Sequence, residues 1–581
     1  MLPRIPFRIM TPPIVFLLFV FLLFAPVPLS ANDLVDKLID RIVSNEQGFL
    51  ERVRQYNPIL ETYIQEVADD LSHGQHPVTD HYMIGKLDTS EGVSHERLFV
   101  SAGFRKSDST VFYPVGFAQM VIPDAYDFNR ETYEFEYVRR EFLGDVRVLV
   151  FDMVPKDSAV AGKFRGRIWV EDHDYNLVRF NGTYTMSKAS SLFFHFDSWR
   201  VNTTPGVWMP AFVYVEDAGY GPNQVRKRFK AQTRLWGYNP FRNRKLDELT
   251  DILIEAEDPI RDDSNPKDVS PVESQRIWIK QAEQNIIHRL EKSGLLAPAG
   301  EVDDVLNTVV NNLLVTNEIN LDVHCRVLLT SPFETFSVGQ AIVISRGLLD
   351  VLPDEASLAG MLATELAHIV LGHGTETMYA FSDQTMIDDK DVLDELGFAR
   401  SDDEVEAANE KAVEILSKSP YAKDLSSVGL FLKALSNHAA ALPNLLRPNL
   451  GNGLEPEGQV PRLGELVKSA PELDDSKIDQ IAALPLGSRV RLNPWTNALR
   501  LIKAKPVALL TAKDKMPFHI TPFMLHLTRV KTGNPSEAAS RGKSPQAAAP
   551  GLRSQFSGDT SLAEGAISAE TSDAPVAGPG Q

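Results

Sequence analysis

The spacing of apolar residues differs between two long parts of this chain of 581 residues. Between residues 79 and 240 they fall in short strand-like runs separated by turns, as in Arg147–Pro155 and Gly166–Gly182. After residue 270 they recur at helical intervals over longer segments. A chain of this length also exceeds a single hydrophobic core. The pattern therefore predicts an α+β protein, with an N-terminal antiparallel β-sheet domain followed by a mostly helical domain.

The first 31 residues have the pattern of a secretory signal peptide. Arg4 and Arg8 precede the apolar run Ile14–Phe24, and a Pro-containing segment ends at Ala31. The apolar run is short for a bilayer span, although an uncleaved anchor is the alternative. We therefore expect an exported bacterial protein that is periplasmic or peripheral to the membrane.

Net charge limits the class of partner, and cysteine content limits the covalent bonds that the chain can form. The formal net charge of −19 argues against nucleic acid, because phosphate binding needs clustered Lys and Arg. The single cysteine, Cys325, excludes a disulfide within the chain.

Composition and periodicity divide the rest of the chain. Residues 32–78 read as a helical lead-in, broken near Asn57-Pro58. A polar linker is followed by a helix that begins after Ser270, with Pro271 in its first turn and Gly294 at its end. The predicted segments are 1–31 signal peptide, 32–78 helical lead-in, 79–240 antiparallel β domain, 241–299 linker and helix, 300–450 helical domain, 451–530 C-terminal extension and 531–581 disordered tail.

The strand-rich segment resembles the lipoprotein-carrier (LolA-like) family. A strand, then Gly-Arg-Ile-Trp-Val, an acidic turn and Leu-Val-Arg-Phe-Asn-Gly carry this resemblance within residues 166–182. It implies a curved sheet that wraps an apolar groove, and lipid or lipoprotein as a partner. An ordinary antiparallel meander packed against a helix is the alternative, since a fold does not determine a ligand.

The chemically informative stretch is Gly347–His373. Asp354 is placed to cap a helix with a buried apolar side. A zinc peptidase helix carries His at positions i and i+4 on one face, and Glu at i+1 to activate the metal-bound water. Here the five residues run from Thr364 to His368, so Glu365 and the second histidine are present while the first ligand is replaced by Thr.

A strand, Ser-Arg-Gly-Leu-Leu-Asp, Asp-Glu-Ala-x-Leu-Ala-Gly and this helix together resemble the gluzincin zinc metallopeptidase family of HtpX, BepA and the CAAX prenyl endopeptidase, over about residues 300–425. The resemblance implies a metallopeptidase domain with Glu365 as the catalytic base and His368 as a zinc ligand. It also implies a third ligand Glu on a later helix, and a substrate strand that adds to the sheet edge Ser337–Ile344.

The later helix resembles the family pattern Glu-Ala-Asp-x-x-Ala-x-Glu-Leu-Leu from residue 407 onward. The ungapped alignment puts Ala407 at the ligand Glu and Asn409 at the following Asp. A shift by one residue puts Glu406 there instead, but turns the helix by about 100°.

Two of the three expected protein ligands are therefore lost, so we expect zinc binding to be weak or absent. His373 follows His368 by five positions, about 140° around a continuous helix, which argues against it as a replacement. The leading hypothesis is an exported protein whose catalytically impaired peptidase-like domain binds extended polypeptides or envelope proteins in quality control. The alternatives are an active zinc metalloendopeptidase with an unorthodox metal site, and a lipid or lipoprotein carrier acting through the N-terminal sheet.

The composition of the tail gives a first prediction. Residues 532–581 are rich in Ala, Gly, Ser and Pro and offer almost no apolar surface to bury. A chain ending at Val530 should therefore melt at the same temperature as the full chain in a thermal unfolding experiment. A clearly lower melting temperature would show that the tail belongs to the folded core.

Overall fold

The structure is a computed structural model, and it describes most of the chain between residues 31 and 530. The described residues are 31–70, 74–89, 94–98, 112–157, 160–185, 194–220, 226–238, 269–383, 393, 396–454, 460–505 and 507–530. The expected signal peptide up to residue 30, the linker residues 239–268 and the tail 531–581 lie outside them. Within the described residues, no helix has the length and apolar character needed to cross a membrane.

A single ten-stranded antiparallel sheet forms the N-terminal part, as expected, in the order β3-β2-β1-β10-β9-β8-β7-β6-β5-β4. Strands that follow one another in the sequence are mostly neighbours in the sheet. The exception is the pair of β1 and β10, which joins strands β1–β3 to the rest of the sheet. The strands are β1 Ile59–Asp70, β2 Gly74–Asp88, β3 Ser94–Arg97, β4 Tyr133–Leu143, β5 Val146–Pro155, β6 Phe164–Glu171, β7 Leu177–Tyr184, β8 Phe196–Thr204, β9 Val207–Tyr220 and β10 Arg226–Trp236.

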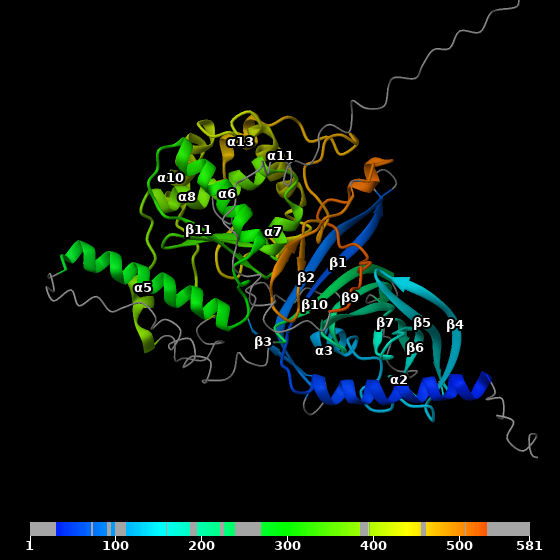
Figure 1. The fold of residues 1–581 in the computed structure, drawn as a ribbon. Coiled ribbons are helices and arrows are strands. Elements are labelled where there is room, and N and C mark those ends of the chain that lie inside the picture. Colours follow the sequence, from blue (N-terminus) through cyan, green and yellow to red (C-terminus); the bar gives the residue numbers. More distant parts are fainter. Residues whose placement is uncertain are drawn as a thin grey trace, which may run out of the picture.

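Both faces of this sheet are largely buried, except at the edge strand β4. Helices α2 (Ala31–Val53) and α3 (Pro114–Gln119) pack on one face, where Phe49 and Phe117 join a core with Phe164 and Phe180. The opposite face joins the core of the helical part, which lies across the sheet from α2 in Figure 1.

The helical lead-in is shorter than expected, because the helix ends at Val53 and the chain re-enters as β1 at Ile59. Ile59, Tyr63 and Val67 are four residues apart, a spacing that puts them on one face of a helix or of a strand. The polar residues between them are buried too, since both faces of β1 are covered. The alternation that identifies a strand is therefore missing from the sequence.

The helical part begins as expected after Ser270, whose side chain accepts a hydrogen bond from the backbone N–H of Glu273. It surrounds a small sheet of order β11-β13-β12-β14. Its elements are α5 Pro271–Lys292, α6 Glu301–Thr316, β11 His324–Leu328, β12 Glu334–Val338, β13 Ala341–Ser345, α7 Arg346–Val351, α8 Glu355–Val370, η4 Thr377–Ala380, α10 Asp402–Ser417, α11 Leu425–His438, α12 Pro443–Leu446, β14 Asn452–Gly453 and α13 Gly464–Ser469.

After α13 (Gly464–Ser469) the chain returns to the N-terminal sheet. It forms the hairpin of β15 (Val490–Leu492) and β16 (Leu499–Leu501), and then runs along the sheet to Val530. The ring of Phe523 lies 3.7 Å from that of Phe212 on β9, measured between centroids. The backbone of Leu527 passes so close to Gly144 that a Cβ atom there would lie 2.5 Å from the Leu527 nitrogen. The C-terminal extension is therefore part of the folded core.

A buried network of charged side chains joins the sheet to the helical part. Glu61 on β1 accepts hydrogen bonds from Tyr82, from the N–H and hydroxyl of Ser331, and from Arg346 at 2.9 Å. Arg346 also pairs with Asp350 at 3.2 Å. Glu61 and Arg346 are both 1% exposed, so each charge depends on its partners.

Replacing Glu61 by Ala should destabilise the protein by roughly 3–5 kcal/mol, because Arg346 would be left buried with an incomplete set of partners. Asp69→Ala is the matched control on the same strand. It removes a carboxylate whose pair with Arg228 is exposed, and it should cost no more than about 1 kcal/mol. Urea unfolding measures both, and equal losses would contradict a special role for Glu61.

Candidate functional site

The site is built on α8, which begins as the sequence predicts. The side chain of Asp354 accepts a hydrogen bond from the N–H of Ser357 and caps the helix. Gly360 lets α11 approach closely, since a Cβ at this position would lie 2.5 Å from a methyl carbon of Val428. The helix is thereby enclosed, and the three motif residues are almost fully buried: Thr364 1%, Glu365 0% and His368 1% exposed.

Glu365, the expected catalytic base, is held in an ion pair. Its Oε1 accepts a hydrogen bond from Arg462 Nη2 at 2.6 Å and another from the Thr335 hydroxyl at 2.6 Å. Arg462 also donates to Thr335 at 2.8 Å, so the three groups form a closed triangle. Burial lowers the pKa of Arg462, and Glu365 opposes that change by stabilising the cation. This carboxylate would have to take the proton of a metal-bound water, and its Oε2 has no hydrogen-bond partner within the described residues.

Helix α10 forms hydrogen bonds with the backbone on both sides of Arg462. The side chain of Asn409 accepts a hydrogen bond from Leu463 N–H at 3.0 Å and donates one to the carbonyl of Pro461 at 3.1 Å. These two bonds fix the backbone on either side of Arg462. Asn409 is the residue that aligns with the family's Asp, so this polar position now orients an arginine.

The two remaining motif side chains are committed to other partners. The Thr364 hydroxyl donates to the carbonyl of Gly360 at 3.1 Å. His368 Nδ1 lies 2.8 Å from His373 Nδ1. The expectation that His373 points away was wrong, because α8 ends at Val370 and Gly372 turns the chain with φ of 73°. A helical angle therefore does not relate these two rings.

Neither candidate for the third ligand completes a metal site. Glu406 and Ala407 on α10 are both exposed. Burial raises the pKa of Glu404, one turn before Ala407, but Ser401, Arg400 and His373 together outweigh it and lower that pKa.

A zinc ion does not fit the donor set that these residues offer. Within the described residues, no three His, Cys, Asp or Glu side chains are grouped so as to hold a metal ion. Thr364 supplies a neutral hydroxyl, and the guanidinium of Arg462 brings a positive charge beside Glu365.

The expected edge strand Ser337–Ile344 is a hairpin instead, with a turn at Gly339-Gln340 between β12 and β13. Strand β12 lies between β13 and the two-residue strand β14, which pairs with it at Glu334 and Thr335. All five residues of β12 are buried. Because both faces of β12 are covered, its polar residues are buried too, and the alternation that would have separated it from β13 is missing.

Residues 396–400 and 449–453 cover the rest of this edge. Phe398 stacks on Phe336 with centroids 4.8 Å apart, and Arg400 reaches the carbonyl of Ser337 at 3.4 Å. Glu334 Oε2 accepts hydrogen bonds from the N–H groups of residues 449, 450 and 451. We call the described residues 449–454 and 460–463 the closing segment, because β14 covers the edge within the first part and Arg462 meets Glu365 within the second.

Sequence reasoning missed Arg462 and Thr335. Arg462 is 97 positions from Glu365, and no motif connects them. A buried carboxylate needs a partner, so a cation was to be expected beside Glu365. Nothing in the sequence pattern indicates which of the cations in the chain that would be.

The protonation of His368 gives a prediction about acid stability. Burial, aided by Arg462 and Arg400, lowers its pKa from 6.5 to about 4. Between these values the unfolded chain binds more protons than the folded one, so stability falls as the pH drops from about 6.5 to about 4, by at most about 3 kcal/mol from this residue. Urea unfolding at about pH 7 and pH 4.5 should show a smaller acid loss for His368→Gln than for the wild type. Equal losses would contradict the lowered pKa.

Comparison with known proteins finds a family match in the part of the chain that contains α8. No curated protein sequence matches the chain significantly. Peptidases of family M48 are normally zinc-dependent. Residues 325–416, which run from β11 to α10 and include α8, match Peptidase family M48, so this part of the chain is peptidase-like.

Proposed function

We propose that the chain is an exported protein whose M48-like domain no longer turns over peptides and serves instead to bind envelope proteins in quality control. The buried ion pair between Glu365 and Arg462 is the observation that carries this proposal. It places a permanent cation on the carboxylate that hydrolysis would need as a base. The N-terminal segment with the pattern of a signal peptide supports the location.

The ion pair opposes catalysis in two ways. The guanidinium occupies Oε1 of Glu365, so a metal-bound water would meet this carboxylate beside an existing cation. The guanidinium also repels a divalent cation near His368, whose pKa it already lowers. Removing Arg462 alone would not create an enzyme, since Thr364 and Ala407 would still supply no ligand.

An extended polypeptide is the partner that this domain suits best. On the side away from β13, strand β12 is paired with β14 at only two of its residues. A polypeptide strand would add to this edge by displacing β14 and the side chain of Arg400. The closing segment would then act as a competitor for the same backbone groups.

An active zinc endopeptidase is the alternative, because Glu365 and His368 keep the family spacing on α8. It requires Arg462 to leave Glu365 and an unorthodox ligand, such as Glu406, to approach His368.

Zinc content separates the two functions. The wild type should lose zinc on dialysis against a mild chelator and should not cleave unfolded casein. The triple variant Thr364→His, Ala407→Glu, Arg462→Met should retain about one zinc per chain, since it restores three protein ligands and removes the competing cation. Elemental analysis after dialysis gives the ratio.

Two controls test the parts of this argument. The variant Thr364→His, Ala407→Glu, with Arg462 in place, should bind zinc at least tenfold more weakly than the triple variant. The variant Thr364→His, Arg462→Met keeps the native Glu406 and should also bind weakly. If it matches the triple variant, Ala407 is not the ligand position. Stoichiometric zinc in the dialysed wild type would overturn the proposed function.

A further inference from the structure

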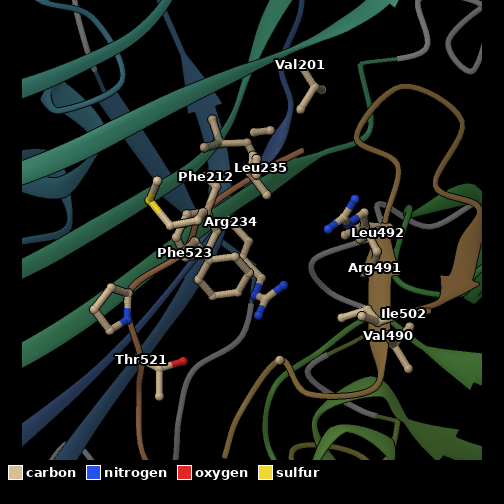
Figure 2. A pocket seen from close by; sticks show the side chains of 15 residues that line it. Val201, Phe212, Arg234, Leu235, Val490, Arg491, Leu492, Ile502, Thr521 and Phe523 are labelled. Atoms are coloured by element: carbon tan, nitrogen blue, oxygen red, sulfur yellow. The ribbon is translucent and has the colours of Figure 1, made fainter. Parts of the chain in front are cut away.

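A cavity of about 230 Å³ lies between the N-terminal sheet and the C-terminal extension. In Figure 2, Phe212, Arg234 and Phe523 stand on one side of it, and Val490, Arg491 and Leu492 of β15 stand on the other. It shares no lining residue with the site around Glu365. It also lies on the face of the sheet opposite α2.

Arg234, on β10, is a buried charge that forms no ion pair within the described part of the chain. It is 6% exposed, and its Nε and Nη2 atoms have no hydrogen-bond partner within the described residues. Its guanidinium carbon lies 5.0 Å from the ring centroid of Phe523 and 5.5 Å from that of Phe212. Ring contacts of this kind do not replace the hydrogen bonds that a buried guanidinium loses on leaving water.

Other buried arginines of this protein are paired. Arg200 forms two hydrogen bonds with Glu46, and Arg346 forms bonds with Glu61 and Asp350. These pairings follow the rule that buried charges are matched. Arg234 is an exception to that rule, and it faces a cavity.

The nearest carboxylates are already engaged. Glu61 is the cross-strand neighbour of Arg234 on β1, but its oxygens accept from Tyr82, Ser331 and Arg346. Asp350 accepts from Arg346 and from the backbone N–H groups of residues 489 and 490. Burial, together with Arg346, lowers the pKa of Arg234 to about 9, so the side chain is still a cation at neutral pH.

We propose that this cavity binds a small aliphatic carboxylate, with the carboxylate on Arg234 and the chain packed between Phe212, Phe523 and Val490. A guanidinium matches a carboxylate with two parallel hydrogen bonds, and the single negative charge balances the buried cation of Arg234, while Arg491 is exposed to solvent. A phosphate dianion would bring an excess charge into a largely apolar cavity. The volume corresponds to about eight water-sized groups at roughly 30 Å³ each, which suits a chain of about eight carbons.

The absence of a side chain at position 487 keeps the space open. Gly487 has φ of 82°, and a Cβ atom there would lie 2.9 Å from the Phe523 ring and 3.1 Å from Arg234 Nη2. Met524, 70% exposed, and Arg491, also exposed, lie at the edge of the cavity where a ligand would enter.

Octanoate is the probe, with octanamide as its uncharged match and inorganic phosphate as the anion without a chain. Isothermal titration calorimetry with the full chain should show saturable, one-to-one binding of octanoate. Octanamide and phosphate should each bind at least tenfold more weakly, because each lacks one of the two recognised parts. Octanoate should also raise the melting temperature of the wild type.

Variants assign the binding to Arg234. Arg234→Met keeps the length and apolar stem of the side chain and should abolish octanoate binding. Its unfolding in the absence of octanoate should be no easier than that of the wild type, since an unpaired buried charge has been removed. Arg491→Met, the control at the exposed edge, should bind octanoate within about twofold of the wild type. If Arg234→Met does not fold, Phe523→Ala should weaken binding by removing one wall.

Three results would overturn the proposal. They are no saturable octanoate binding by the wild type, equal affinity for octanamide, and an equal loss of affinity in Arg491→Met and Arg234→Met. None of them bears on zinc or on the Glu365–Arg462 pair, so this test is independent of the proposed function.

Discussion

The buried contact of Glu61 with Arg346 determines how the two halves of this protein are placed. Glu61 lies on the first strand of the sheet and Arg346 begins α7 in the helical part, 285 positions away. Because neither charge reaches water, each must meet the other with suitable geometry, and few arrangements of the two halves satisfy that condition. The apolar core that runs from the sheet into the helical part supplies the driving force, while this pair supplies the alignment.

The second buried pair has a different consequence. Glu365 and Arg462 convert a position that normally supports water activation into a closed internal contact. The same closing segment also carries β14, which pairs with β12. The cation on the carboxylate and the strand on the sheet edge are thus both supplied by residues 449–454 and 460–463. The contact with Glu365 and the closure of the edge therefore belong to one arrangement of the fold.

Arg234 differs from the paired arginines because its neighbouring carboxylates, Glu61 and Asp350, accept hydrogen bonds from other groups. The C-terminal extension contributes the opposite wall of its cavity, so this site exists only when residues 487–525 lie against the sheet. The peptidase-like domain and the cavity depend on different segments, and the contacts of Glu61 and Asp350 lie between them.

The sequence by itself determined the α+β class, the antiparallel sheet, the start of α5 and α8, and the positions of Thr364, Glu365 and His368 on one helix. These features follow from periodicity, capping residues and motif spacing, which act over a few positions in the chain. The strand at Ile59–Asp70, the hairpin turn at Gly339-Gln340 and the return of His373 to His368 were misread. In the first two cases burial on both sides removed the pattern that identifies the element, and in the third a helix end changed the geometry. Only the tertiary structure decided which arginine meets Glu365, because a buried charge requires a partner without specifying where in the chain it comes from.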